Sequence, residues 1–298
     1  MNIKNKAQFI EYFSKGIKSS DQLKIGVEHE RFLFEGKEKK RISNNTLNQL
    51  FKNLESNKWM PLYEKENIIG MKRGAQQITT EPGLQCELSG APLNNIHEVC
   101  SESSDFLKEI QQASQGLNIN TVSIGFDPFN SLKNISQSPK QRYKIMKDIM
   151  PESGKQSLEM MYRTCGIQIN YDYVSENNFE KIFRLGNYLT PLTIALYANS
   201  PFENKKLTGF NSYRNKVWQN TSRGGIMPIA FEKMTFEKYF DHIIDYPILF
   251  AIRDKNYIKP NGQTFKDFIL GNFSNLKDEA NLSDFETHLA TIFTEVRL

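Results

Sequence analysis

The sequence predicts an α+β protein in which helices flank an antiparallel sheet. Segments with strand-like alternation and β-branched residues cover residues 25–34, 77–88, 119–126 and 160–173. Stretches with helical spacing of apolar residues lie between and after them. Because the two kinds of segment follow one another irregularly, and not as repeated strand–helix–strand units, an antiparallel sheet is favoured over a parallel one.

Helices are expected where apolar residues recur every three or four positions. Pro191 and Pro247 each lie inside such a stretch, where a proline is expected to kink or end the helix. Asp284 is expected to cap the last helix, which is followed by a strand-like run over residues 294–298. The expected helices cover residues 9–17, 47–54, 96–110, 178–199, 235–252 and 284–293.

Length and composition predict a single globular domain over residues 1–298. The chain is 39% hydrophobic and 12% aromatic, enough for a substantial core, and no repeat or long linker divides it. A net charge of +4 with scattered basic residues gives no sign of a nucleic-acid partner. No apolar run approaches the roughly 20 residues of a membrane helix, so no membrane contact is expected.

A cytoplasmic location is expected because the N-terminus lacks the apolar core of a signal peptide. The cysteines are Cys86, Cys100 and Cys165, without the spacing of a zinc site. Reduced, structural thiols are the simplest interpretation in a reducing compartment, and a regulatory disulfide is the alternative.

The first chemically informative stretch is the strand-like segment over residues 25–34. Alternate residues of a strand share a face, so Glu28 and Glu30 point the same way, about 6.5–7 Å apart. Two carboxylates at this spacing suit hard cations such as Mg²⁺, which also binds phosphate oxygens. The alternative is an ordinary solvent-exposed strand face.

A second acidic pair, Glu81 and Glu87, stands on either side of a Pro-Gly turn in strand-prone sequence. Four acidic side chains could therefore converge on one sheet. Lys72, just upstream, is a candidate to bind phosphate, although a solvated basic turn would read the same way.

Two further stretches carry polar residues that suit a small ligand. Gln168 alternates with apolar neighbours in a segment that otherwise looks like core, so its amide needs a partner, either protein groups or a ligand with its metal ions. Arg214 and Arg223 flank Trp218, and an arginine fork beside an aromatic wall suits an α-carboxylate, although surface packing is more common.

Phosphate-binding glycine loops are absent. The sequence contains no GxxxxGK[ST] loop and no GxGxxG fingerprint, nor the GxSxG elbow of hydrolases. If ATP binds, it is expected to be held by metal-bound carboxylates on a sheet.

These segments resemble the glutamate–cysteine ligases of the plant and proteobacterial type. The run GVEHERFLF at 26–34 is similar to the family's GVEHEKFGF, and EPGLQCELSGAPL at 81–93 is similar to EPGGQFELSGAPL. The run MMYRTCGIQINYD at 160–172 resembles MMLRTCTVQVNLD. Family-like segments also occur at 198–202 and 295–298, so the likeness covers nearly the whole chain.

The resemblance implies a glutamine-synthetase-like fold, a funnel-shaped antiparallel sheet lined by metal-binding carboxylates. It also implies an ATP- and Mg²⁺-dependent ligase that joins the γ-carboxylate of glutamate to the amine of cysteine, through a γ-glutamyl phosphate, as the first step of glutathione biosynthesis. The implied residues are Mg²⁺ ligands Glu28, Glu30, Glu81 and Glu87; Lys72 and Gln168 near the nucleotide and its metal; Arg163, Thr164, Arg214 and Trp218 for the amino-acid substrate; and Glu28, Glu87 and Arg223 in catalysis.

The chain departs from the family pattern at its end. In the family a strand similar to EMRGAD follows the TEVRL-like segment, and here the sequence stops at Leu298. A catalytic domain truncated at the C-terminus is therefore expected, and the chain as given could lack activity. The competing hypotheses are a ligase of the same superfamily with another acceptor amine, and a silent fragment that binds nucleotide without turnover. The sequence does not indicate the oligomeric state.

Overall fold

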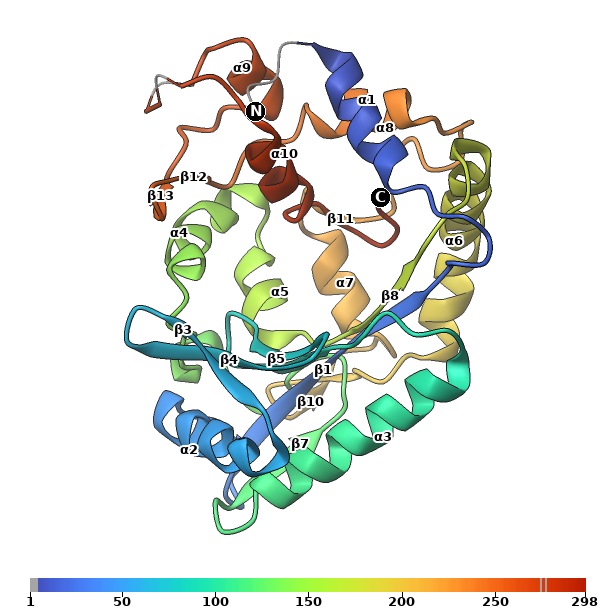
Figure 1. Cartoon of the computed structure of the whole chain (residues 1–298). Helices are drawn as coiled ribbons and strands as arrows, with labels where there is room; N and C mark the ends of the chain where they lie inside the picture. Colours follow the sequence, from blue (N-terminus) through green and yellow to red (C-terminus); the bar gives the residue numbers. More distant parts are fainter. Residues whose placement is uncertain (1–4, 274, 277) are drawn as a thin grey trace.

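A computed structural model describes residues 5–273, 275–276 and 278–298, and confirms an α+β fold (Figure 1). Its helices are α1 Lys6–Lys15, α2 Asn44–Leu54, α3 Ile96–Ala113, α4 Gln141–Ile149, α5 Ser157–Arg163, α6 Glu176–Leu196, α7 Tyr213–Gln219, α8 Phe236–Ile243, α9 Phe265–Ile269 and α10 Leu282–Leu289, with short 3₁₀ helices η1 Glu55–Asn57, η2 Leu132–Asn134 and η3 Met150–Ser153.

The main sheet is antiparallel and is organised around its longest strand, β1. Within the described residues it has eight strands in the order β2-β1-β6-β5-β4-β3, with β7 and β8 also paired to β1. Short two-stranded ladders β9-β10, β11-β14 and β12-β13 lie outside it. The strands are β1 Ile25–Glu35, β2 Lys40–Arg41, β3 Met60–Glu64, β4 Asn67–Arg73, β5 Gln76–Thr80, β6 Cys86–Ser89, β7 Ile119–Val122, β8 Ile167–Tyr171, β9 Phe202–Glu203, β10 Lys206–Leu207, β11 Gly224–Gly225, β12 Ala251–Arg253, β13 Asn256–Ile258 and β14 Phe293–Thr294.

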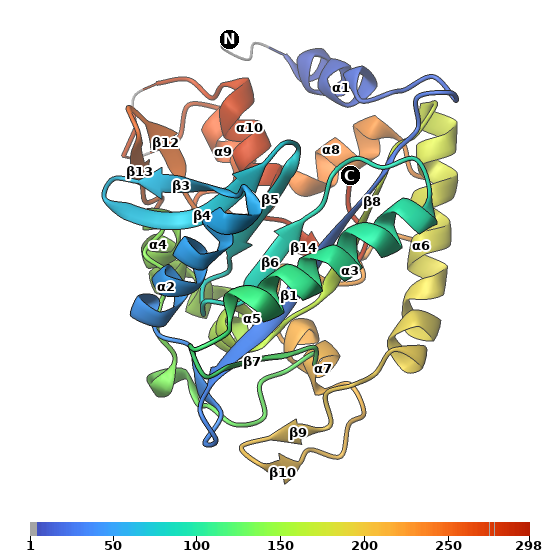
Figure 2. The same ribbon diagram turned by 60° about the horizontal axis from the view of Figure 1, so that its bottom comes forward.

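One face of the sheet is apolar and packs against α2 and α3, which cover it together (Figure 2). Leu33, Met71, Ile78 and Leu88 point into this core and are fully buried. The opposite face is turned toward α4, α5 and α7 (Figure 1). Strand alternation therefore leaves a polar set of side chains on that second face.

A second core is rich in phenylalanine and joins the two ends of the chain. Phe9 of α1 packs against Phe240 of α8 and Phe285 of α10, with ring centroids 4.6 Å apart in both pairs. Aromatic pairs at this distance add to the free energy of simple burial. The first helix is thereby fixed to helices formed more than 200 residues later.

Most of the expected elements are present, but several differ in kind or extent, and the strand-like run expected over 294–298 is a strand only at its start, in β14. The strand predicted over 160–173 is wrong in its first part, because Ser157–Arg163 forms α5 and the strand β8 begins only at Ile167. The helix predicted over 235–252 ends at Ile243, before Pro247, whereas α6 continues through Pro191. Asn281 caps α10, and Asp284 accepts the cap's backbone N–H from inside the first turn.

The apolar residues of β8 are not part of the core, contrary to expectation. Ile167 is 64% exposed and Ile169 is 47% exposed. On the neighbouring surface of α6, Leu185, Leu189 and Leu192 are also exposed. In the described part of the chain, no helix is both long enough and apolar enough to span a membrane.

A buried ion pair joins β2 to the loop after β7. Arg41 donates to Asp127 at 3.3 Å, and both side chains are inaccessible to solvent. Asp127 also accepts the backbone N–H groups of Phe129 and Asn130. Arg41 donates in addition to the carbonyl of Tyr162, so the pair also fixes the end of α5.

Replacing Asp127 with alanine should therefore be strongly destabilising. The change leaves the buried Arg41 charge without its partner, which costs about 3–5 kcal/mol in comparable cases. Urea denaturation of Asp127→Ala should show this loss, whereas Asp105→Ala, which removes an exposed pair with Lys108, should leave the midpoint unchanged. Equal midpoints for the two variants would contradict the structural role of the buried pair.

Candidate active site

The antiparallel register brings the acidic residues of β1 and β6 together on the polar face. Glu30 lies directly opposite Glu87, and Glu28 lies directly opposite Gln168 of β8. Residues paired in this way have Cβ atoms about 5 Å apart and share a face. All four side chains therefore lie on the face away from α2 and α3.

Glu81 reaches the same region from the turn between β5 and β6. Its N–H donates to the carbonyl of Gln85, and Leu84 closes the turn by donating back to Glu81 with a left-handed backbone (φ 63°). Glu81 and Glu87 line the same cavity of about 340 Å³. One acidic surface, the acidic face, is therefore formed by Glu28, Glu30, Glu81 and Glu87.

Each of the carboxylates is held by short hydrogen bonds from its neighbours. Glu30 accepts the N–H of Gly166 at 2.7 Å. Glu87 accepts the hydroxyl of Ser89 at 2.7 Å. Glu28 accepts the amide of Gln168 at 3.0 Å. These contacts fix the carboxylates in place before any ligand binds.

The protonation of this surface is strongly perturbed. Burial raises the pKa of Glu30 to about 8, and the charges of Glu81 and Glu87 add to the rise. Burial and the charge of Glu81 also raise the pKa of Glu87 to about 7, although the hydroxyl of Ser89 opposes this. Like charges across a strand pair are unfavourable unless a proton or a cation neutralises them.

The acidic surface fits divalent ions that complete their coordination with other oxygens. In the described residues, no three Asp, Glu, His or Cys side chains are placed to hold one ion between them. Mg²⁺, however, is commonly bound through one or two carboxylates, with waters and phosphates as the remaining ligands. Separate carboxylates along one face therefore suit Mg²⁺ that is bound together with a phosphate-bearing ligand.

Two basic residues that sequence analysis did not single out line the same cavity. Lys140 donates to the carbonyl of Thr80 at 2.9 Å, and burial and Arg142 lower its pKa to about 8. Arg142 donates to the hydroxyl of Tyr143, which in turn donates to Glu81 at 3.1 Å. Both cations precede or begin α4, and their spacing in the sequence carried no recognisable phosphate motif.

Arg214 and Trp218 of α7 lie on the other side of Glu30. The Arg214 guanidinium stacks over the Trp218 ring at 4.8 Å, next to Gly166, and its charge lowers the pKa of Glu30. Its Nε is buried and has no hydrogen-bond partner in the described part of the protein. An unsatisfied buried donor beside an aromatic wall is well suited to a carboxylate ligand.

Thr164 lies beside Trp218, and protein groups engage its hydroxyl. Its hydroxyl donates to the carbonyl of Met160 and accepts the indole N–H of Trp218 at 3.2 Å. The side chain is buried. Thr164 therefore contacts Trp218 directly, and its expected role in binding the substrate stays a prediction.

The expected substrate role of Arg163 is not supported by its position. Its side chain is 1% exposed and stacks over Phe126. The guanidinium donates to Glu159 at 3.0 Å and to the carbonyl of Asp127 at 2.9 Å, and Glu203 lies 3.5 Å away. These protein groups hold the terminal nitrogens of the guanidinium, and the substrate role of Arg163 stays a prediction.

Arg223 is likewise buried away from the carboxylates. It donates to the carbonyls of Thr291 and Pro247 and to the hydroxyl of Thr291. Burial lowers its pKa to about 10. Arg223 thus links the start of β11 to the segment after α10, and its expected catalytic role stays a prediction.

Lys72 and Gln168 both belong to the polar face, at its two sides. Lys72 is opposite Gln77, which lines the cavity, but the lysine itself is exposed and does not line it. Gln168 donates to Glu28 and accepts from Arg297 at 2.6 Å. The partners of the Gln168 amide are thus protein groups.

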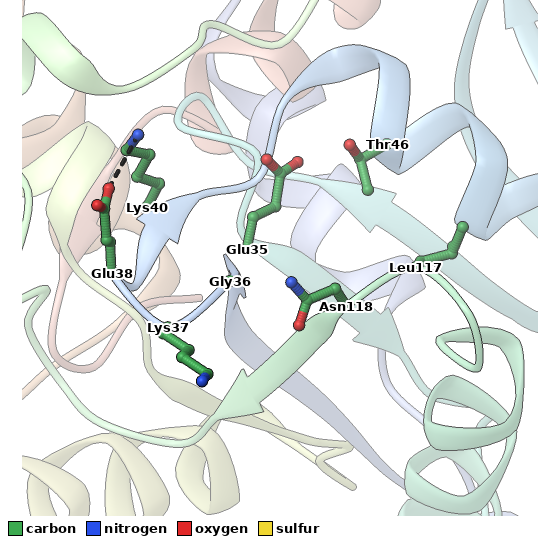
Figure 3. A pocket seen from close by; sticks show the side chains of 8 residues that line it. All are labelled: Glu35, Gly36, Lys37, Glu38, Lys40, Thr46, Leu117 and Asn118. Atoms are coloured by element: carbon green, nitrogen blue, oxygen red, sulfur yellow. Dashed lines mark ion pairs between the residues drawn. The ribbon is translucent and has the colours of Figure 1, made fainter.

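A second hollow, of about 360 Å³, lies at the turn between β1 and β2 (Figure 3). Its lining mixes Glu35 and Glu38 with Lys37 and Lys40, and Lys40 pairs with Glu38 at 3.0 Å. Glu35 is already occupied by the hydroxyl and N–H of Ser43. This open surface has no group directed at a ligand, so the acidic face is the candidate site.

Known proteins resemble this chain over almost its whole length. Residues 24–298 match the family described as Glutamate-cysteine ligase family 2 (GCS2). The chain is 41% identical over 298 residues to the chloroplastic glutamate–cysteine ligase of Medicago truncatula, covering 98% of this chain and 59% of the relative. It is 40% identical over 294 residues to the chloroplastic enzyme of Arabidopsis thaliana, covering 97% of this chain and 56% of the relative.

These comparisons also correct the expected location. The relatives from Medicago truncatula, Oryza sativa subsp. japonica, Nicotiana tabacum and Arabidopsis thaliana are all named as chloroplastic, which contradicts a cytoplasmic assignment. The chain spans about 60% of the length of the curated relatives it matches. With a family match over residues 24–298 and about 40% identity to these relatives, the chain belongs to the glutamate–cysteine ligase family 2.

Proposed function

We propose that this protein ligates the γ-carboxylate of glutamate to the amine of cysteine, with conversion of ATP to ADP and phosphate. The proposal rests on the position of Glu30 directly opposite Glu87. Cations flank this pair on both sides, with Lys140 and Arg142 toward one end of the face and Arg214 toward the other. Family membership agrees with this function. We also propose that residues 1–298 act as one catalytic domain.

Glu28, Glu30, Glu81 and Glu87 are the proposed ligands for Mg²⁺. The ion, when bound, neutralises phosphate charge and polarises the phosphoryl oxygens. Lys140 and Arg142 would bind phosphate oxygens directly, because both are cationic donors on the cavity wall. Arg214 would hold the α-carboxylate of glutamate with its guanidinium group, while Trp218 excludes water from one side.

The proposed reaction has two steps. An oxygen of the glutamate γ-carboxylate attacks the γ-phosphorus of ATP, the bond to the bridging oxygen breaks, and ADP leaves. The cysteine nitrogen then attacks the acyl carbon, loses a proton, and expels phosphate. Lys140, Arg142 and Arg214 stabilise the negative charges that must approach one another in the first step.

The overall proposal is tested by coupled measurement of ADP release. The protein with Mg·ATP should release ADP when glutamate and cysteine are both present, and much less when cysteine is replaced by another primary amine. A higher rate with a different amine would assign the site to another ligase reaction. ADP release that does not depend on glutamate would refute the proposed chemistry.

Loss of a ligand carboxylate should abolish metal-dependent nucleotide binding. Glu87→Gln keeps the shape and the hydrogen bonds to Ser89 but is a poorer ligand for a hard cation. Titration calorimetry with Mg·ATP should therefore show no binding for Glu87→Gln, and normal binding for the control Glu66→Gln in the exposed turn between β3 and β4. Normal binding by both variants would exclude Glu87 as a ligand.

The cation-free protein should become less stable as the pH rises from about 5 to about 8. Because the folded-state pKa values of Glu30 and Glu87 are raised above 4.5, the folded form holds protons that the unfolded chain releases. Each proton that is released on unfolding lowers the free energy of unfolding by up to about 1.4 kcal/mol per pH unit. Denaturation in EDTA should show this slope, which Glu30→Gln reduces and Mg²⁺ at pH 8 offsets. A flat profile would contradict the raised pKa values.

Removing Arg214 should affect glutamate more than nucleotide. A charge-assisted hydrogen bond contributes about 1.5–3 kcal/mol, so Arg214→Ala should raise the KM for glutamate by at least about 10-fold and leave Mg·ATP binding intact. Lys216→Ala, on the same helix but stacked on Phe210, is the matched control. An unchanged KM for glutamate in Arg214→Ala would place the amino acid elsewhere.

A further inference from the structure

The cavity changes in chemical character across the sheet. Five residues form a single cross-strand row on the cavity face, each directly opposite the next: Leu62 of β3, Gly70 of β4, Thr79 of β5, Glu87 of β6 and Glu30 of β1. The row runs from an apolar residue at the sheet edge to two carboxylates at its centre. From β3 to β6 it covers three strand spacings, about 14 Å, a reach that suits an extended nucleoside triphosphate.

The apolar end of the row is shaped by a bulge and a glycine. The pairing of β3 with β4 shifts after Leu62, so that Ile69 is an extra, unpaired residue and lines the cavity. Gly70, between Leu62 and Thr79, has no side chain, and a Cβ added there would lie 2.6 Å from the carbonyl oxygen of Ile78. The floor of the cavity is therefore flat and apolar at this end.

Tyr257 of β13 provides the opposite wall. It lines the cavity together with Leu62 and Ile69, and its ring packs edge-on against Phe250 with centroids 5.1 Å apart. Glu64 and Arg142 lie close enough to influence its hydroxyl pKa, which burial raises. The apolar lining of the cavity consists of the Tyr257 ring, Leu62 and Ile69. The other residues that line it are polar or charged.

We propose that this end of the cavity is the nucleobase subsite, with the base between Tyr257 and the Leu62–Gly70 floor. The nucleotide then lies across the strands, with its phosphates beside Lys140, Arg142 and the carboxylates. A planar base suits an aromatic face and a flat apolar floor, because stacking requires little hydrogen-bond complementarity. The inference rests on the proposed ATP dependence and adds the direction in which the nucleotide lies and the residues that hold its base.

The test compares Mg·ATP with Mg·tripolyphosphate, which has the phosphates and no base, by titration calorimetry. Tyr257→Ala should weaken Mg·ATP binding at least tenfold and leave tripolyphosphate binding unchanged. Lys140→Ala should weaken the binding of both ligands. Tyr63→Ala is the matched control, since Tyr63 is an exposed tyrosine of β3 that does not line the cavity.

Leu62→Ala gives an independent measurement, because Leu62 belongs to the sheet edge and the variant does not depend on the β12–β13 hairpin being intact. It should also weaken Mg·ATP selectively. The subsite assignment is overturned if Tyr257→Ala and Leu62→Ala leave Mg·ATP binding unchanged, or weaken both ligands equally. Failure of the wild-type protein to bind either ligand would instead refute the proposed function, and the subsite with it.

Discussion

The mutual repulsion of carboxylates on one sheet face is the constraint on which this site depends. Glu30 and Glu87 are fixed opposite each other by the pairing of β1 with β6, and neither can turn away, because each is held by hydrogen bonds from Gly166 or Ser89. The unfavourable charge density is balanced in part by Arg214 and Lys140 at the margins. The imbalance that remains is reflected in the raised pKa values of Glu30 and Glu87.

The parts of the site that sequence reasoning located are those in which period-2 alternation fixes the direction of a side chain. Glu28 and Glu30 belong to one strand, so their shared face followed from the alternation of side chains, whereas the facing of Glu87 depends on how β6 pairs with β1. Helix starts were also readable where Ser43 or an equivalent cap stood before an apolar repeat. The fold class followed from the irregular order of the same segments.

The rest depended on tertiary contacts that leave no local pattern. The structure places Arg163 and Arg223 against backbone carbonyls, and no local sequence pattern indicates those contacts. Lys140 and Arg142 line the cavity only because α4 is placed against the turn that carries Glu81. Met160 and Met161 read as strand, yet they are helical because they pack into a core with Tyr143 and Phe126.

Strand β1 contributes side chains to both faces of the sheet. Glu28 and Glu30 alternate with His29 and Arg31, and Leu33 continues the second set into the core beneath the sheet. Deleting or inserting one residue near its centre would exchange the two sets beyond that point, turning carboxylates toward the apolar helices or leucine toward the polar face. A substitution in this strand changes one side chain, whereas a change in its length alters the facing of every residue beyond it.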